Sequence, residues 1–218
     1  MGNRLEYRGK WSDIFWQVIL LVLASIFTLG LAVPWAFVAY RRKVLSFTFY
    51  QGAPLYYDGE GGEYFGQIML GLLLTLVTLG FYLSLGFYQA RLLKYDVSHT
   101  ILPGGQRMVF TGTGLDLFGQ YLLIAVLSGL TLGIYGFWGY ARMRRFILQH
   151  TFVEGRPLNF SGTGGQYLGI SLIIALLSAI TLGIYSFLGM STTRMLRWDA
   201  QNTIIPDFVI PPLPYQTS

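Results

Sequence analysis

The chain has 218 residues, of which 53% are hydrophobic and only 11% charged, with a net charge of +5. Ordinary soluble domains carry about 25% charged residues, so this composition argues against a soluble enzyme. The chain has no cysteine, which excludes disulfides, thiolate metal sites and a cysteine nucleophile.

Four long stretches without charge divide the chain. All 25 charged residues (15 basic and 10 acidic) lie outside residues 14–40, 64–90, 117–141 and 157–193. Each stretch exceeds the roughly 20 apolar residues that cross a bilayer. The pattern predicts an all-α integral membrane protein. The first stretch could also be read as a signal peptide, but it belongs to the repeat below and is expected to be retained.

A unit of about fifty residues recurs four times along the chain. Thr-Leu-Gly begins at residues 28, 78, 131 and 181, so the spacings are 50, 53 and 50. Before each lies an aromatic residue, any residue and then Gly, and this Gly is always 19 residues before the Thr. An Arg follows each last glycine by 11 residues. Fixed offsets between three markers predict four tandem copies of one structural unit.

The copies also pair at a spacing of about 103 residues. Copies two and four share the segments at 91–96 and 194–199, while copies one and three share paired arginines at 41–42 and 144–145. We therefore divide the chain into residues 1–104, with copies one and two, and 105–204, with copies three and four. Residues 205–218 contain Pro206, Pro211, Pro212 and Pro214 and are predicted to be an extended tail, because proline opposes helix.

Each copy is predicted to be a helical hairpin. An acidic or amide residue marks the start of a first apolar helix, since its side chain can satisfy free N–H groups there. A structural turn follows at a glycine that is expected to take positive φ. The second leg is aromatic and then basic, and short β-prone runs connect the copies. The predicted turns lie at Gly30, Gly80, Gly133 and Gly183.

Two topologies are open, because each copy could be one tilted span or a hairpin. In the hairpin alternative there are about eight membrane legs, some of them short, and all 15 basic residues lie on one side. The positive-inside rule then places both termini and the β-prone connections in the cytoplasm. The same alternative brings an acid or amide and an Arg of one copy to the base of its hairpin. The candidate pairs are Asp13 with Arg41, Glu63 with Arg91, Asp116 with Arg144, and Gln166 with Arg194.

The pattern in copy three resembles a known family. Its elements are Thr-Leu-Gly-Ile-Tyr from Thr131, an aromatic at Trp138, the basic run 142–145 and Phe-Ser-Gly-Thr from Phe160. It is similar to the YjgN-like family of bacterial inner-membrane proteins, which carry domain of unknown function 898. The resemblance implies a multi-pass protein of the bacterial inner membrane, and no catalytic residues come with it.

The residues that could carry chemistry are few. His99 and His150 are the only histidines; either could contact a haem or pigment, but a hydrogen bond at the start of a turn is the simpler interpretation, and we expect no cofactor or metal. The basic residues predict anionic lipid headgroups as a partner, not nucleic acid. We expect a non-enzymatic scaffold or accessory subunit that packs against other membrane proteins. A transporter or channel for a lipid or small apolar molecule is the alternative.

Overall fold

The computed structural model describes residues 4–206, so most of the predicted tail lies outside the described residues. The helices are α1 (Trp11–Phe27), α2 (Val33–Ser46), α3 (Gly61–Val77), α4 (Phe81–Ser84), α5 (Phe87–Ser98), α6 (Gly114–Leu130), α7 (Gly136–Gln149), α8 (Gly164–Ile180), α9 (Ile184–Phe187) and α10 (Met190–Asn202). The strands are β1 (Glu6–Tyr7), β2 (Thr48–Tyr50), β3 (Ala53–Pro54), β4 (Tyr56–Tyr57), β5 (Thr100–Ile101), β6 (Val109–Phe110), β7 (Thr151–Val153), β8 (Arg156–Pro157), β9 (Asn159–Phe160) and β10 (Thr203–Ile204).

Each copy forms one helical hairpin, which we call an arm. The arms are α1/α2, α3–α5, α6/α7 and α8–α10. The first helix of every arm has 17 residues. Two of these helices begin with a capping box, in which Thr113 and Asp116, or Thr163 and Gln166, exchange hydrogen bonds between side chain and backbone. These caps satisfy N–H groups that the helix itself leaves free.

The Thr-Leu-Gly marker builds the turn at the outer end of each arm. The Thr131 hydroxyl donates to the Leu127 carbonyl at 2.8 Å and accepts from the Tyr135 N–H at 2.9 Å, so it links the two helices. Thr78 and Thr181 make the same two contacts in their arms. The glycine N–H bonds to the carbonyl five residues earlier, as in a Schellman motif. The four glycines have φ between +88° and +91°.

Short strands pair the start of each copy with its end. Backbone hydrogen bonds between the connections, such as the one from the Leu55 N–H to the Thr48 carbonyl at 2.8 Å, join consecutive copies into a ring. Strand β1 pairs with β2, β4 with β5, β6 with β7, and β9 with β10. The ring closes where the Leu5 N–H donates to the Thr203 carbonyl at 3.2 Å, and α10 packs against β1 and α1. Helix packing follows the same order, since α2 contacts α3, α5 contacts α6 and α7 contacts α8.

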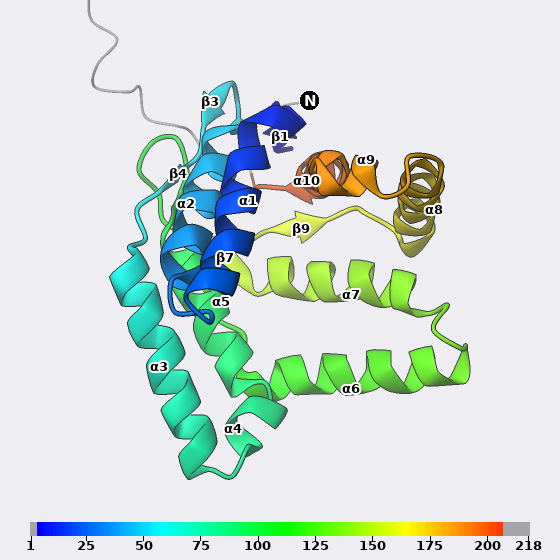
Figure 1. Cartoon of the computed structure of the whole chain (residues 1–218). Helices are drawn as coiled ribbons and strands as arrows, with labels where there is room; N and C mark the ends of the chain where they lie inside the picture. Colours follow the sequence, from blue (N-terminus) through cyan, green and yellow to red (C-terminus); the bar gives the residue numbers. More distant parts are fainter. Residues whose placement is uncertain (1–3, 207–218) are drawn as a thin grey trace, which may run out of the picture.

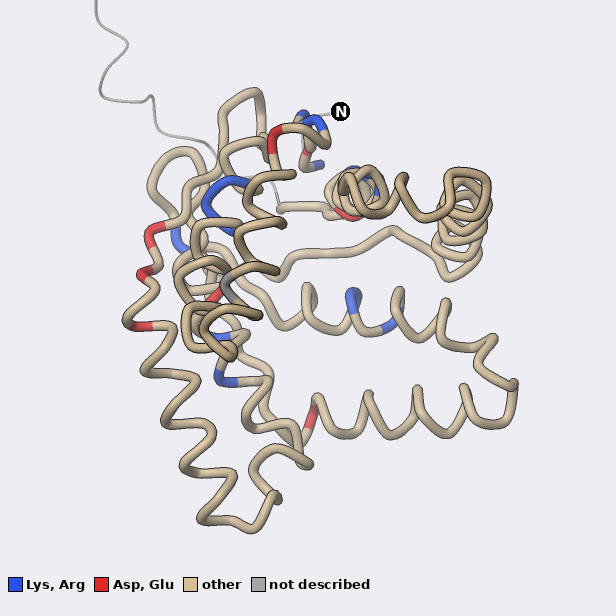
Figure 2. Tube along the Cα trace, viewed as in Figure 1, with Lys and Arg blue, Asp and Glu red and all other residues tan. Residues whose placement is uncertain are grey.

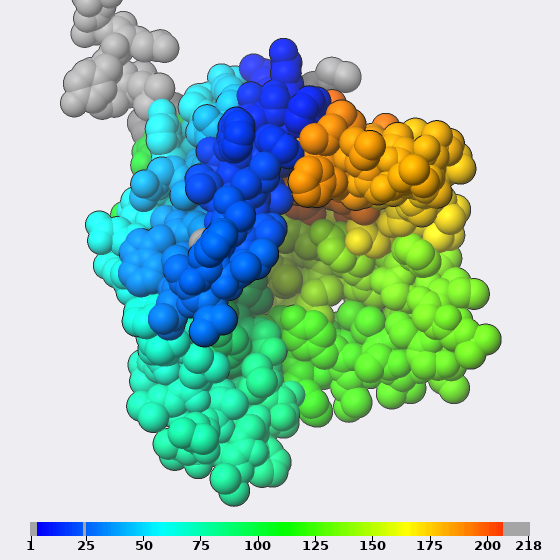
Figure 3. Space-filling model, in the orientation of Figure 1, coloured from blue at the N-terminus to red at the C-terminus, as the bar shows by residue number. Residues whose placement is uncertain are grey.

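The arms extend from a shared centre in different directions. In Figure 1, α3 and α4 reach the bottom of the view while α6 and α7 reach the right. In Figure 3 the arm α3–α5 projects at the bottom, and the arms α6/α7 and α8–α10 project at the right and touch each other. Charged residues gather near the centre, and the outer ends of the arms are uncharged (Figure 2). The buried core lies at the centre, with Tyr50, Leu55, Leu102 and Leu158 at most 1% exposed.

The structure corrects the predicted fold class. Among the helices of residues 4–206, none is both long and apolar enough to cross a membrane. The reason is the Thr-Leu-Gly turn, which breaks each uncharged stretch into a 17-residue helix and a shorter second leg. At 1.5 Å per residue, such a helix is about 25 Å long, short of a hydrocarbon core of about 30 Å. The prediction of an all-α integral membrane protein with about eight membrane legs was therefore wrong. So was the predicted multi-pass location in the bacterial inner membrane with cytoplasmic termini.

Candidate functional site

The inner ends of the four arms meet around one central cavity of about 190 Å³, which we call the hub. A buried threonine ends the second leg of each copy, at Thr48, Thr100, Thr151 and Thr203. Each threonine hydroxyl donates to the carbonyl four residues earlier, at 2.8–3.0 Å. The residues three, four and seven positions before each threonine also line the cavity, because residues at this spacing share one helix face.

The hub therefore consists of four-membered rings, one residue from each copy. Besides the threonines, the rings are Leu45, Val97, Leu148 and Ala200; Val44, Asp96, Ile147 and Asp199; Arg41, Leu93, Arg144 and Leu196; and Leu5, Leu55, Met108 and Leu158. Two of the rings alternate between apolar and charged residues. This alternation follows the duplication of 103 residues and gives the hub its charged pairs.

Two ion pairs cross the hub from one copy to the next. Arg41 donates through Nε and Nη2 to the two carboxylate oxygens of Asp96, each at 2.7 Å. Arg144 makes the same two-point contact with Asp199, with 2.6 Å between Nε and Oδ1. Burial alone would lower the pKa of Arg144, but the adjacent Asp199 carboxylate outweighs burial and raises it. These bidentate contacts fix the copies relative to each other.

The pairs predicted within single copies are arranged differently. Arg41 and Arg144 reach into the hub, whereas Asp13 accepts from the Lys10 N–H at 2.7 Å and Asp116 caps its own helix. Gln166 likewise caps α8. The hydroxyl and the N–H of Thr113 donate hydrogen bonds to the Asp116 carboxylate and so lower its pKa. The acids and the amide thus stabilise helix starts, and the arginines of copies one and three join copies.

Sequence reasoning missed Asp96 and Asp199 as the partners of these arginines. Both aspartates lie four residues before the buried threonine, in register with each other. Arg41 and Arg144 lie seven residues before theirs. Aligning the copies on the threonine, instead of on Thr-Leu-Gly, would have placed all four side chains on corresponding helix faces.

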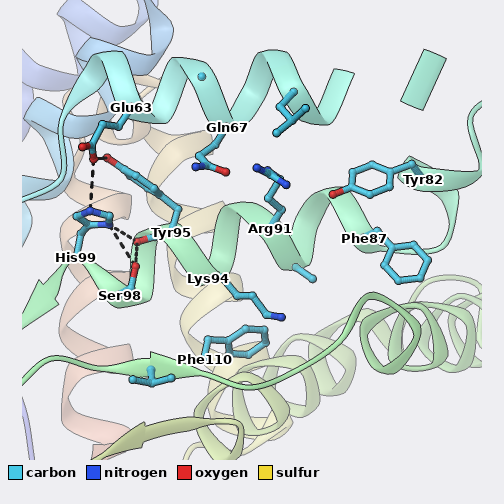
Figure 4. A pocket seen from close by; sticks show the side chains of 14 residues that line it. Glu63, Gln67, Tyr82, Phe87, Arg91, Lys94, Tyr95, Ser98, His99 and Phe110 are labelled. Atoms are coloured by element: carbon cyan, nitrogen blue, oxygen red, sulfur yellow. Dashed lines mark hydrogen bonds and ion pairs between the residues drawn. The ribbon is translucent and has the colours of Figure 1, made fainter. Parts of the chain in front are cut away.

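A groove of about 1030 Å³ lies between α3 and α5. Figure 4 shows its polar side chains in sequence along the groove, from Glu63 and His99 at one end, past Gln67, Arg91 and Lys94, to Tyr82 at the other. Glu63 accepts from the Tyr95 hydroxyl at 3.1 Å and lies 3.5 Å from Nε2 of His99. Burial raises the pKa of Tyr95 to about 12, so its hydroxyl remains a donor at neutral pH.

The Glu63–Arg91 and Gln166–Arg194 pairs form no ion pair or hydrogen bond among the described contacts. Arg91 lies in the groove with a buried Nε that has no hydrogen-bond partner within residues 4–206. Arg194 lies over the ring of Tyr185, with 6.0 Å from its guanidinium carbon to the ring centroid. The two copies that lack a hub arginine thus place their arginines in grooves beside the second leg.

Comparison with known proteins assigns the chain to a family. The family described as "Bacterial protein of unknown function (DUF898)" matches residues 52–129, 105–161 and 156–208. The matches together span residues 52–208 of 218 and follow one another along the internal copies. The chain belongs to this family. The family predicted from the sequence is confirmed, while the narrower likeness to YjgN stays a prediction. No curated protein and no solved structure matches the chain.

The histidines of this DUF898 protein have local partners. Nδ1 of His99 lies 2.8 Å from the Tyr95 carbonyl, and Nδ1 of His150 lies 2.9 Å from the Phe146 carbonyl. Each ring thus bonds to the carbonyl four residues earlier at the end of its helix. Within residues 4–206, no three His, Asp or Glu side chains group closely enough to hold a metal ion.

The outer ends of the arms of this DUF898 protein hold four of the six residues other than glycine that have positive φ among the described residues; the other two are Gln51 and Glu154. The leucine of each Thr-Leu-Gly turn has φ of +50° or +51°, a conformation that costs about 1–2 kcal/mol for a residue with a Cβ. These leucines are also 90–95% exposed. They are Leu29, Leu79, Leu132 and Leu182. Large apolar side chains beside them are exposed as well, among them Phe27, Leu76, Leu130 and Phe187, each at least 70%.

Proposed function

We propose that this protein is a non-enzymatic scaffold or accessory subunit that packs the apolar ends of its arms against a larger complex. The proposal rests on the leucines of the four Thr-Leu-Gly turns, which we call the tip leucines. Each of them is both strained and exposed. Neither property stabilises the isolated fold. Backbone strain retained at corresponding positions suggests a role outside folding, and extended exposed apolar surface is typical of interaction sites.

The partner class that we propose is a membrane protein. An apolar, uncharged arm end fits an apolar partner surface, because no charged group loses its hydration on contact. The basic residues lie nearer the hub, where those of copies one and three contact protein groups, so nucleic acid is not proposed as a partner. The alternative of a transporter or channel gains no support from the hub, whose 190 Å³ is below the range of about 300–1,000 Å³ typical of ligand sites.

Replacing all four tip leucines by asparagine tests the proposal. Asparagine adopts positive φ at less cost than leucine, so the variant should melt at the same or a higher temperature than the wild type. It should nevertheless lose a partner that co-purifies with the wild type at fixed stoichiometry from native cells, without crosslinker. The Leu→Asn changes thus separate docking from stability.

Tyr56→Asn is the matched control, because Tyr56 is 54% exposed in β4, away from the arm ends. The control should retain the partner. Retention of the partner by the tip variant would contradict the proposal. Co-purification of lipid alone, lost in the tip variant, would replace the protein partner by a lipid surface.

A further inference from the structure

The groove between α3 and α5 differs from its counterparts in one repeated contact. A basic residue lies six positions before the buried threonine in every copy, at Arg42, Lys94, Arg145 and Arg197. The three arginines each donate to the glycine carbonyl of the aromatic-x-Gly marker in the next copy. These contacts join Arg42 to Gly59 at 3.1 Å, Arg145 to Gly162 at 3.2 Å and Arg197 to Gly9 at 3.1 Å.

Lys94 does not make this contact among the described residues. It is exposed and lines the groove instead, together with Arg91 from the preceding turn of α5. The one carboxylate that lines the groove, Glu63, is occupied by Tyr95 and His99 at one end. Two positive charges therefore lie in the middle of the groove without an acidic partner among residues 4–206.

The rest of the groove offers hydrogen-bond donors and an apolar wall. The Gln67 amide lies beside Arg91, and the hydroxyl of Tyr82 points toward Arg91 (Figure 4). Leu70, Phe87 and Val109 line the groove as well. The Tyr82 and Phe87 rings stack with their centroids 5.8 Å apart, toward the apolar end of the arm. A volume of about 1030 Å³ suits a ligand much larger than a simple ion.

We propose that this groove binds an anionic amphiphile. A phosphate or carboxylate head would lie between Arg91 and Lys94, where two cations and neighbouring donors can bond to its oxygens. An alkyl chain would lie along Leu70, Tyr82 and Phe87 toward the end of the arm. A lipid and a free fatty acid share this chemistry. The proposal goes beyond the docking role and does not depend on it.

The duplication supplies an internal comparison. Arg194 and Arg197 lie 103 positions after Arg91 and Lys94. They line a smaller pocket of about 410 Å³, which Lys10 and Trp11 also line. There Arg194 lies over Tyr185 and Arg197 bonds to Gly9, so both cations have protein partners. Only the groove of copy two should therefore bind the amphiphile, with one molecule per chain.

Calorimetric titration of the full-length protein with dodecyl phosphate, in a neutral sugar detergent, tests the proposal. The wild type should bind one equivalent, and Arg91→Gln/Lys94→Gln should bind at least tenfold more weakly. Arg194→Gln, the matched control, should bind like the wild type. Dodecanol lacks the charge and should bind at least tenfold more weakly than dodecyl phosphate. Inorganic phosphate lacks the alkyl chain and should also bind at least tenfold more weakly.

Dodecanoate and short-chain phosphatidic acid distinguish the source of the ligand. Whichever of the two ligands binds more tightly identifies a carboxylate or a phospholipid head as the preferred group. Either result supports the site. Equal affinity of the double variant and the wild type for dodecyl phosphate would overturn the proposal. So would equal affinity of the wild type for dodecyl phosphate and inorganic phosphate. Loss of tip docking in the leucine variants has no bearing on these results.

Discussion

At the residue scale, polar side chains stabilise the starts of the arms. Thr113 with Asp116 and Thr163 with Gln166 form the same capping box at corresponding positions, one with a carboxylate and one with a neutral amide. The duplication thus offers two chemically matched caps in one molecule. Only the cap with the Asp116 carboxylate can respond to pH, because the Gln166 amide does not titrate.

We expect Asp116→Asn to destabilise the protein at pH 7 and to cost less as pH falls toward 3. Hydrogen bonds from Thr113 lower the pKa of Asp116, so the stability they provide is present above the ordinary aspartate pKa of about 4. It is lost as pH falls through the lower value in the folded protein. Thr113→Ala should cost about 0.5–2 kcal/mol.

Urea unfolding from pH 7 to pH 3 measures these effects, with Gln166→Ala as the control. Its cost should not change with pH, since an amide does not titrate in this range. A pH-independent cost of Asp116→Asn would show that the carboxylate charge adds nothing to the cap.

At the element scale, the start of each later arm packs closely against the second leg of the arm before it. A Cβ at Gly61, Gly114 or Gly164 would lie 2.9, 2.7 and 2.6 Å from the Cα of Trp35, Phe87 and Trp138, respectively. These three glycines occupy corresponding positions and allow the backbones of neighbouring arms to approach. Residue 11 holds a tryptophan at this place in copy one.

Gly164→Ala should therefore lower the free energy of unfolding by about 1–3 kcal/mol, the range for overpacking. Its neighbour Gly165 has no atom within 4 Å of an added Cβ, so Gly165→Ala should be neutral or stabilising. Denaturant unfolding of the two single variants provides the comparison. Equal stability of the two would mean that the close approach of α8 to Trp138 does not constrain this interface.

The sequence predicted much of each element and little of how the elements meet. The Thr-Leu-Gly repeat marked the four turns, and the aromatic and proline-containing runs marked the connections where strands form. The error was the membrane prediction, because the length of each whole uncharged stretch was compared with a bilayer although the same repeat predicted a turn inside it. The helix before each turn has only 17 residues, so the uncharged stretch overstates the length of any one helix.

At the scale of the whole molecule, four copies close into a ring around one hub. The cross-copy pairs could not be found by treating each copy alone, because Arg41 and Asp96, or Arg144 and Asp199, belong to different copies 55 residues apart. The groove was missed for a related reason: Lys94 matters because it departs from a contact that three arginines make. Both features follow from comparing copies in three dimensions.

Arg–Asp pairs tie copy one to copy two and copy three to copy four at the hub. Reversing both charges, with Arg144→Asp and Asp199→Arg, tests this pairing most directly by denaturant unfolding. Each single change leaves two like charges together and should cost about 3–5 kcal/mol, less where solvent reaches the pair. The double variant should be more stable than either single variant, with a coupling energy above about 1 kcal/mol. The mismatched combination of Arg144→Asp with Asp96→Arg should recover less, because Asp96 acts on Arg144 less strongly than Asp199 does. Additive costs in the matched double variant would contradict the pairing and the arrangement of copies built on it.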